Sequence, residues 1–275
     1  MKKLSILAFA LVAILSAQSA KAWAGFGHAG ITYVAEQHLT PEAKKKCRYY
    51  LRHTLPYYAS WMDSWRLAEK FRDVNVPHSV MATNDGKGIN FSGGKPAGRA
   101  MGHLVNALAE LGDGKYKNLP DSVVRQRIIN MIHYLPDIHC PSHVKFKKPF
   151  ARSYTQGVTK NGKTIDVHAF WDGSPGIGRK GWELEVYAKN VDKISRKQAK
   201  AWQSGSLEDW GRDLAKGAIR RYDLLPDGTE ITNMSKAEMA AVTSLADEMA
   251  MMAAYRLAHV LNTIFADGNI PVKNK

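Results

Sequence analysis

Cysteine is scarce in this sequence, in which Cys47 and Cys140 are the only two among 275 residues. So few cysteines exclude a small disulfide-rich scaffold, in which bridges take the place of a large hydrophobic core. One bridge in an oxidising compartment and two free thiols are both compatible with the sequence.

Long apolar runs are also missing from the chain after its first 22 residues, where no segment approaches the roughly 20 apolar residues of a membrane helix. At the N-terminus, two lysines precede an apolar run from Leu4 to Leu15, and a small-x-small triplet follows at 20–22. This order is typical of a cleaved secretory signal peptide. We expect residues 1–22 to be removed, leaving residues 23–275 as a secreted or periplasmic protein without stable membrane insertion. An uncleaved N-terminal anchor is the alternative.

Fixed-period repeats and low-complexity tracts are absent from the sequence, and strand-like alternation is scarce. Helical periodicity recurs instead, and this pattern predicts a mainly helical, all-α protein. The roughly 253 residues of the mature chain suffice for a single large domain. Clear helical segments are residues 27–39, 41–53, 98–111, 121–135, 207–222 and 235–265.

The last of these segments begins after Ser235, a good N-cap, and contains Met249, Met251 and Met252. Thioethers at helical spacing usually fill gaps in a core, so we interpret these methionines as core residues rather than metal ligands.

Acidic residues are outnumbered by basic ones, 25 against 39, and the formal net charge is +14. Charge of this size favours encounters with polyanions such as nucleic acid, although it also serves solubility. Basic and aromatic residues alternate in the segment KFKKPFARSY, which suits stacking on bases and contact with phosphates. Its first four residues are our predicted substrate contacts, and a merely solvated loop is the alternative: Lys145, Phe146, Lys147 and Lys148.

Histidine and aspartate residues occur at spacings that metal sites use. His133 and Asp137 are four residues apart, as are His168 and Asp172, so on a helix each pair shares one face. Imidazole nitrogen and carboxylate oxygen are ligands that zinc accepts. One such pair is more often a surface pair than a site, but several together favour a metal cluster. Further candidates are Asp63, His78 and His143.

These residues fall into motifs that resemble, in order, those of the S1/P1 zinc nuclease family. The resemblance extends over essentially the whole mature chain and includes the late segment AAYRLAHVLNTIF. The motifs are W-x-x-x-G-H at 23–28, S-W-x-D-x-x-R at 60–66, P-H at 77–78, H-x-x-x-D-x-x-x-P-x-H at 133–143, and H-x-x-W-D at 168–172.

The resemblance implies a mostly helical single-domain fold, shared with zinc-dependent phospholipases C, that holds three zinc ions at the bottom of a cleft. By position, the first zinc would be bound by Asp63, His78, His133 and Asp137. The second would be bound by His143, His168 and Asp172. The third would be bound by His28, Asp137 and the backbone amine and carbonyl of Trp23, so Asp137 would bridge two ions.

The implied activity is hydrolysis of single-stranded DNA and RNA to 5'-phosphate products, together with 3'-nucleotidase activity, by a monomeric enzyme. Hydroxide held between the first and third zinc ions would attack phosphorus. The resemblance makes Asp63 and Arg66 the catalytic residues: Asp63 would orient the attacking water, and Arg66 would offset charge on the phosphoryl oxygens.

The sequence departs from the family pattern at several positions. Pro136 replaces a glycine before the bridging aspartate and removes a helix hydrogen bond, and Cys140 replaces a glutamine. Ser79 and Met81 stand where an aromatic and an acidic residue often hold the base, which leaves base preference open.

Two other functions are compatible with parts of this pattern. A phospholipase C would carry glutamate rather than Asp172 at the second zinc, and that position favours the nuclease. A zinc- or nucleic-acid-binding protein without turnover would need neither a bridging Asp137 nor Arg66. We therefore expect a zinc-dependent endonuclease.

Overall fold

The computed structural model describes residue 23 and residues 25–65, 78–90, 99–146, 158–226 and 228–271. Residues 1–22, Arg66, Lys147 and Lys148 lie outside the described residues, and so do their predicted roles. No helix in the described part of the chain is long and apolar enough to cross a membrane.

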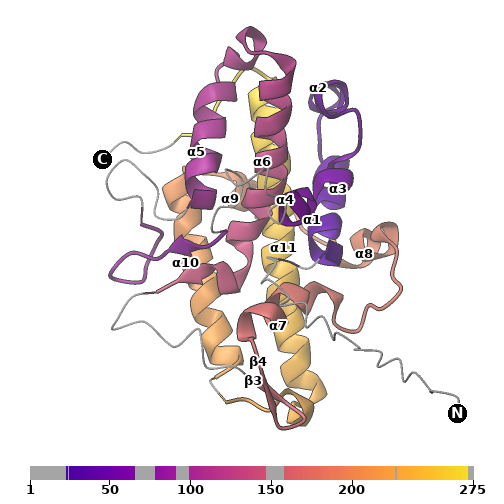
Figure 1. Ribbon diagram of the computed structural model, residues 1–275, viewed down its shortest axis with the longest axis vertical. Coiled ribbons are helices and arrows are strands. Elements are labelled where there is room, and N and C mark those ends of the chain that lie inside the picture. The colour runs from indigo at the N-terminus through magenta and orange to yellow at the C-terminus, as the bar shows by residue number, and fades with distance from the viewer. Residues whose placement is uncertain are drawn as a thin grey trace, which may run out of the picture.

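The described chain is mainly helical, as the sequence predicts (Figure 1). Each segment that was expected to be helical contains a helix, and short helices follow residue 166 that the periodicity did not indicate. The helices are α1 (Gly25–Gln37), α2 (Pro41–Leu51), α3 (Leu55–Tyr58), α4 (Trp61–Trp65), α5 (Arg99–Leu111), α6 (Asp121–His139), α7 (Val167–Gly173), α8 (Leu184–Val191), α9 (Arg196–Gln203), α10 (Leu207–Leu224) and α11 (Lys236–Phe265).

Strand is limited to two small ribbons within the described residues. β1 (Val80–Met81) pairs in parallel with β2 (Val144–Lys145). β3 (Val158–Lys160) pairs antiparallel with β4 (Lys163–Ile165) through a turn with positive φ at Asn161 and Gly162. The β1–β2 pair matters for the site, because it holds the residue after Ser79 against the residue after His143.

Two long helices, α6 and α11, pack side by side at the centre of the molecule (Figure 1). α11 begins with a capping box, in which the Ser235 hydroxyl accepts from the Glu238 backbone N–H and the Glu238 carboxylate accepts from the Ser235 backbone N–H. Met249, Met251 and Met252 are buried in the hydrophobic core, as predicted. The hydrophobic core is thus built around α11, and α6 packs against this helix.

α6 is buried on all sides over its second half, because every residue from Ile128 to His139 is buried. Such a stretch is normally apolar all round, yet this one includes His133, Asp137 and His139. The helix continues through Pro136, and the Pro136 carbonyl accepts a hydrogen bond of 2.8 Å from the Trp23 indole N–H. The N-terminal residue of the predicted mature chain is therefore attached to the end of α6.

α1 is held against α8 by a close approach at Gly30. A Cβ added at Gly30 would lie 2.7 Å from the Tyr187 ring, so only glycine allows this spacing. The contact fixes the helix that carries His28, which lies two residues before Gly30 in the first turns of α1.

The cysteines are not bridged. Cys47 on α2 and Cys140 after α6 are both buried free thiols. The alternative of a disulfide therefore does not hold in this structure.

Arg256 of α11 connects four helices through a buried guanidinium group. It donates to the Trp202 carbonyl of α9 at 2.9 Å, to His139 Nε2 of α6 at 3.1 Å and to the Asp213 carboxylate of α10 at 2.6 Å. The side chain is fully buried, so its charge depends on these partners.

Replacing this arginine tests how much the helix packing depends on it. We expect Arg256→Ala to lower the free energy of unfolding by about 3 kcal/mol, because two buried groups, the Trp202 carbonyl and His139 Nε2, lose their donor and the partly exposed Asp213 carboxylate loses its ion pair. Arg220→Ala, which removes an exposed ion pair with Glu248, should cost less than about 1 kcal/mol. Urea denaturation of both variants measures the difference, and equal losses would contradict this account.

Candidate metal centre

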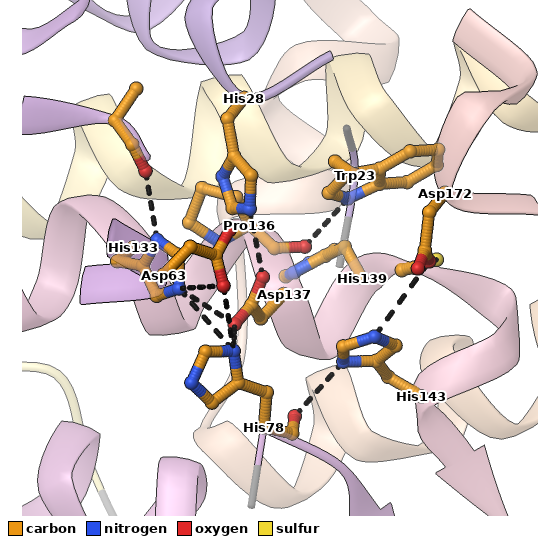
Figure 2. Close-up of polar contacts among 12 residues, drawn as sticks. Trp23, His28, Asp63, His78, His133, Pro136, Asp137, His139, His143 and Asp172 are labelled. Carbon is orange, nitrogen blue, oxygen red and sulfur yellow. Dashed lines mark hydrogen bonds and ion pairs between the residues drawn. The ribbon is translucent and has the colours of Figure 1, made fainter. Parts of the chain in front are cut away.

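Four of the predicted ligands surround a fifth, the Asp137 carboxylate, which projects from α6 (Figure 2). The Asp137 group consists of His28, Asp63, His78, His133 and Asp137. His28 comes from α1, Asp63 from α4 and His133 from α6, and His78 lies just before β1. The group therefore joins four segments that are far apart in the sequence.

The two oxygens of Asp137 face different partners. Oδ1 lies 3.0 Å from His28 Nε2. Oδ2 lies 2.7 Å from His78 Nδ1 and 3.3 Å from His133 Nε2. Asp63 completes the second side, because its Oδ1 is 3.7 Å from His133 Nε2 and 3.8 Å from His78 Nδ1.

A second group lies beside the first, where α6 ends and a 3₁₀ turn (η4, Pro141–His143) begins. We call Cys140, His143, His168 and Asp172 the Asp172 group. His143 Nε2 lies 2.7 Å from His168 Nε2 and 3.8 Å from Asp172 Oδ1. His168 Nε2 lies 3.5 Å from Asp172 Oδ2, and both residues come from α7, one turn apart.

Backbone carbonyl groups orient two of the imidazoles. His133 Nδ1 donates to the Ala59 carbonyl at 2.8 Å, and His143 Nδ1 donates to the His78 carbonyl at 3.1 Å. Each ring therefore turns its Nε2 toward its own group. This is how proteins commonly fix the tautomer of a histidine that binds a metal.

Burial keeps His133, His143 and His168 neutral. It lowers the pKa of His133 to about 3 and that of His168 to about 4, and it holds the pKa of His143 well below its usual value. Burial alone would raise the pKa of Asp137, but His133 and His78 outweigh it and hold that pKa well below the usual range. A neutral imidazole with an ionised carboxylate is the state in which both bind metal.

The pKa of Asp172 is shifted in the opposite direction from that of Asp137. Burial raises its pKa well above the usual range, although hydrogen bonds from Cys140 and Ser142 act against the shift. A cation at this group would therefore be needed to make the ionised carboxylate favourable.

The buried polar atoms of both groups fit a metal. Both ring nitrogens of His28, both oxygens of Asp137 and Asp172 Oδ2 are buried without a hydrogen bond of ordinary geometry. Such atoms are costly to bury and are rare in folded proteins. Their close mutual distances without hydrogen bonding indicate ligand atoms that face a shared ion. Among the described residues, three sets of buried atoms are close enough to hold one: His28, His133 and Asp137; Asp63, His78 and His133; and Cys140, His143 and Asp172.

The other predicted site residues that the structure describes, Trp23, Lys145 and Phe146, differ in burial. Trp23 is fully buried and lies near both groups in Figure 2. Lys145 is exposed, whereas the Phe146 ring is buried and packs against Tyr222 at 6.2 Å. Little of that ring is open to a base, and its contact with substrate stays a prediction.

One contact of the site carried no signal in the sequence. The Ala59 carbonyl acts through its backbone alone, so no side chain marked it. His139 points away from both groups, since its Nδ1 donates to the Leu135 carbonyl at 2.8 Å and its Nε2 accepts from Arg256. It joins the end of α6 to α11.

The arrangement around Asp137 predicts a loss of metal when its charge is removed. We expect Asp137→Asn to bind at least one divalent ion fewer per chain, since a neutral amide cannot balance an ion there. Elemental analysis of zinc-loaded protein measures the content. Asp192→Asn is the control, because Asp192 is partly buried but hydrogen-bonded to His38 and Tyr255. Full metal content in Asp137→Asn would contradict the geometry.

Comparison with known proteins agrees with this site. The chain matches the family model described as S1/P1 Nuclease over residues 23–266, nearly its whole length. A comparison with curated proteins gave no match. This family consists of zinc-dependent nucleases, and the two buried groups fit metal binding. The match and the metal-site geometry lead to one conclusion: the chain belongs to the S1/P1 nuclease family.

Proposed function

We propose that this nuclease is a zinc-dependent phosphodiesterase that cuts single-stranded DNA and RNA to 5'-phosphate products and also acts on 3'-nucleotides. The observation that carries the proposal is the split environment of Asp137, with one oxygen toward His28 and the other toward His78 and His133. A carboxylate in this position suits two ions at once, as a cluster that handles phosphoryl groups requires.

The proposed ligand sets follow the two groups. One ion would take Asp63, His78, His133 and Asp137, and a second would take His143, His168 and Asp172. A third would take His28, Asp137 and the backbone amine and carbonyl of Trp23. We propose three ions in total, and the short distances between ligand atoms around Asp137 and Asp172 support this proposal.

Zinc supplies Lewis acidity and lowers the pKa of a bound water toward neutrality. The protein's own groups arrange the reaction around it. Asp63 borders His78 and His133, and its carboxylate can accept a hydrogen bond from a water and orient it toward a phosphate. Arg66 would bind phosphoryl oxygens as a planar, permanently charged donor. Lys145, at the exposed end of β2, would contact the nucleic acid backbone.

A substrate panel tests the proposed activity. Zinc-loaded protein should release 5'-phosphate products from single-stranded DNA and RNA and phosphate from 3'-AMP, with slower cleavage of duplex DNA. Chelation should abolish all of these, and added zinc should restore them. Phosphatidylcholine serves as the comparison substrate, because a phospholipase C has the related fold. Cleavage of the lipid but none of the nucleic acids would contradict the proposal.

We also propose that residues 1–22 are removed on export and that the new N-terminus helps to form the site. Trp23 is fully buried, and its indole binds the carbonyl that precedes Asp137. The family match begins at the same residue. An amine can donate its electron pair to zinc only when no peptide bond occupies it.

Extending the mature chain by one residue tests this role of the N-terminus. We expect protein with an alanine before Trp23 to lose one zinc and to cut single-stranded DNA at least about tenfold more slowly, because the amine becomes an amide. Protein with one alanine added at the C-terminus is the control. Unchanged zinc content and rate in the first protein would show that the amine is not a ligand.

A further inference from the structure

Two buried donors outside the proposed ligand sets meet one oxygen of Asp172. Cys140 follows α6 and Ser142 lies in η4, and both side chains are fully buried. The Cys140 thiol donates to Asp172 Oδ1 at 3.4 Å, and the Ser142 hydroxyl donates to the same atom at 3.3 Å. The sulfur and the hydroxyl oxygen also lie 3.0 Å apart.

The other oxygen of Asp172 is left for a different partner. Oδ2 is buried without a hydrogen bond and lies 3.5 Å from His168 Nε2. A carboxylate can rotate about its Cβ–Cγ bond and offer either oxygen, so two donors on Oδ1 select one orientation. The buried surroundings make that selection strong, since a lost donor cannot be replaced by water.

The same short turn connects both halves of the centre. The Cys140 backbone N–H donates to the Asp137 carbonyl, and the His143 backbone N–H donates to the Cys140 carbonyl, each at 2.9 Å. Residues Cys140 to His143 therefore position a ligand histidine and two donors as one unit. Neither donor depends on a separate loop.

We propose that Cys140 and Ser142 are positioning residues that hold Asp172 Oδ1, so that Asp172 offers Oδ2 to a metal ion shared with His143 and His168. The inference rests on the metal centre of the proposed function. Coordination by the sulfur is the competing arrangement, because 3.4 Å also separates two ligands of one zinc ion. Hydrogen bonding from both side chains accounts for their similar distances to Asp172 Oδ1.

Cobalt substitution separates the two arrangements. Coordination by a thiolate gives Co(II) an intense near-ultraviolet charge-transfer band, whereas nitrogen and oxygen ligands do not. We expect no such band from the cobalt-loaded wild-type protein. A band that disappears in both Cys140→Ala and Cys140→Ser would make the sulfur a ligand and overturn the proposal.

Metal affinity tests the positioning role directly. In competition with a chelator, Cys140→Ala and Ser142→Ala should each weaken one cobalt site, and the double variant should weaken it by at least about tenfold. Cys140→Ser keeps a donor and should stay within about threefold of wild type. Unchanged affinity in the double variant would also overturn the proposal.

Two controls separate this result from other failures. Cys47→Ala removes the other buried thiol, on α2, and should leave cobalt affinity unchanged. Thermal melts of the metal-free variants identify a general loss of folding, which would weaken every site rather than one. Metal binding is measured without nucleic acid, so a protein that binds cobalt as expected but cuts no substrate would contradict the nuclease activity and leave this inference standing.

Discussion

The position of Asp137 at the buried end of α6 is the constraint on which the rest of the site depends. A carboxylate in the core is unfavourable unless positive charge or donors surround it. His28, His78 and His133 approach it from three segments, and burial keeps His133 neutral. The protein thus places the predicted ligands around a buried carboxylate, an arrangement that fits a metal ion. The packing of the fold brings those segments to one end of α6.

Backbone groups and buried side chains of the surrounding structure fix the predicted ligands. The Ala59 and His78 carbonyls orient His133 and His143, and Arg256 ties the end of α6 to α9, α10 and α11 through His139. These contacts come from the core rather than from surface loops. The centre is therefore as rigid as the helix packing around it, and rigid ligands favour one metal geometry over others.

Much of this arrangement could be predicted from the sequence, for identifiable reasons. The four-residue spacing of His133 and Asp137 follows from helix geometry, and α6 confirms it. The convergence of Asp63 and His78 on that helix, and of His168 on His143 just after it, came from the family resemblance, because no local pattern relates them. The short helices α8 and α9 were missed, since eight residues give periodicity too little length. The burial of Phe146 depends on Tyr222, which is distant in sequence.

The hydrogen bond from Trp23 to Pro136 links residues 113 positions apart, and the contact between Arg256 of α11 and His139 of α6 links residues 117 positions apart. The two contacts therefore close loops of similar entropy. They differ in their surroundings, because α11 supplies much of the buried core, whereas Trp23 precedes the first helix of the described chain. Local opening at this end would then expose one side of the centre while the core stays folded. Hydrogen exchange would register this as early loss of protection in α1, ahead of α6.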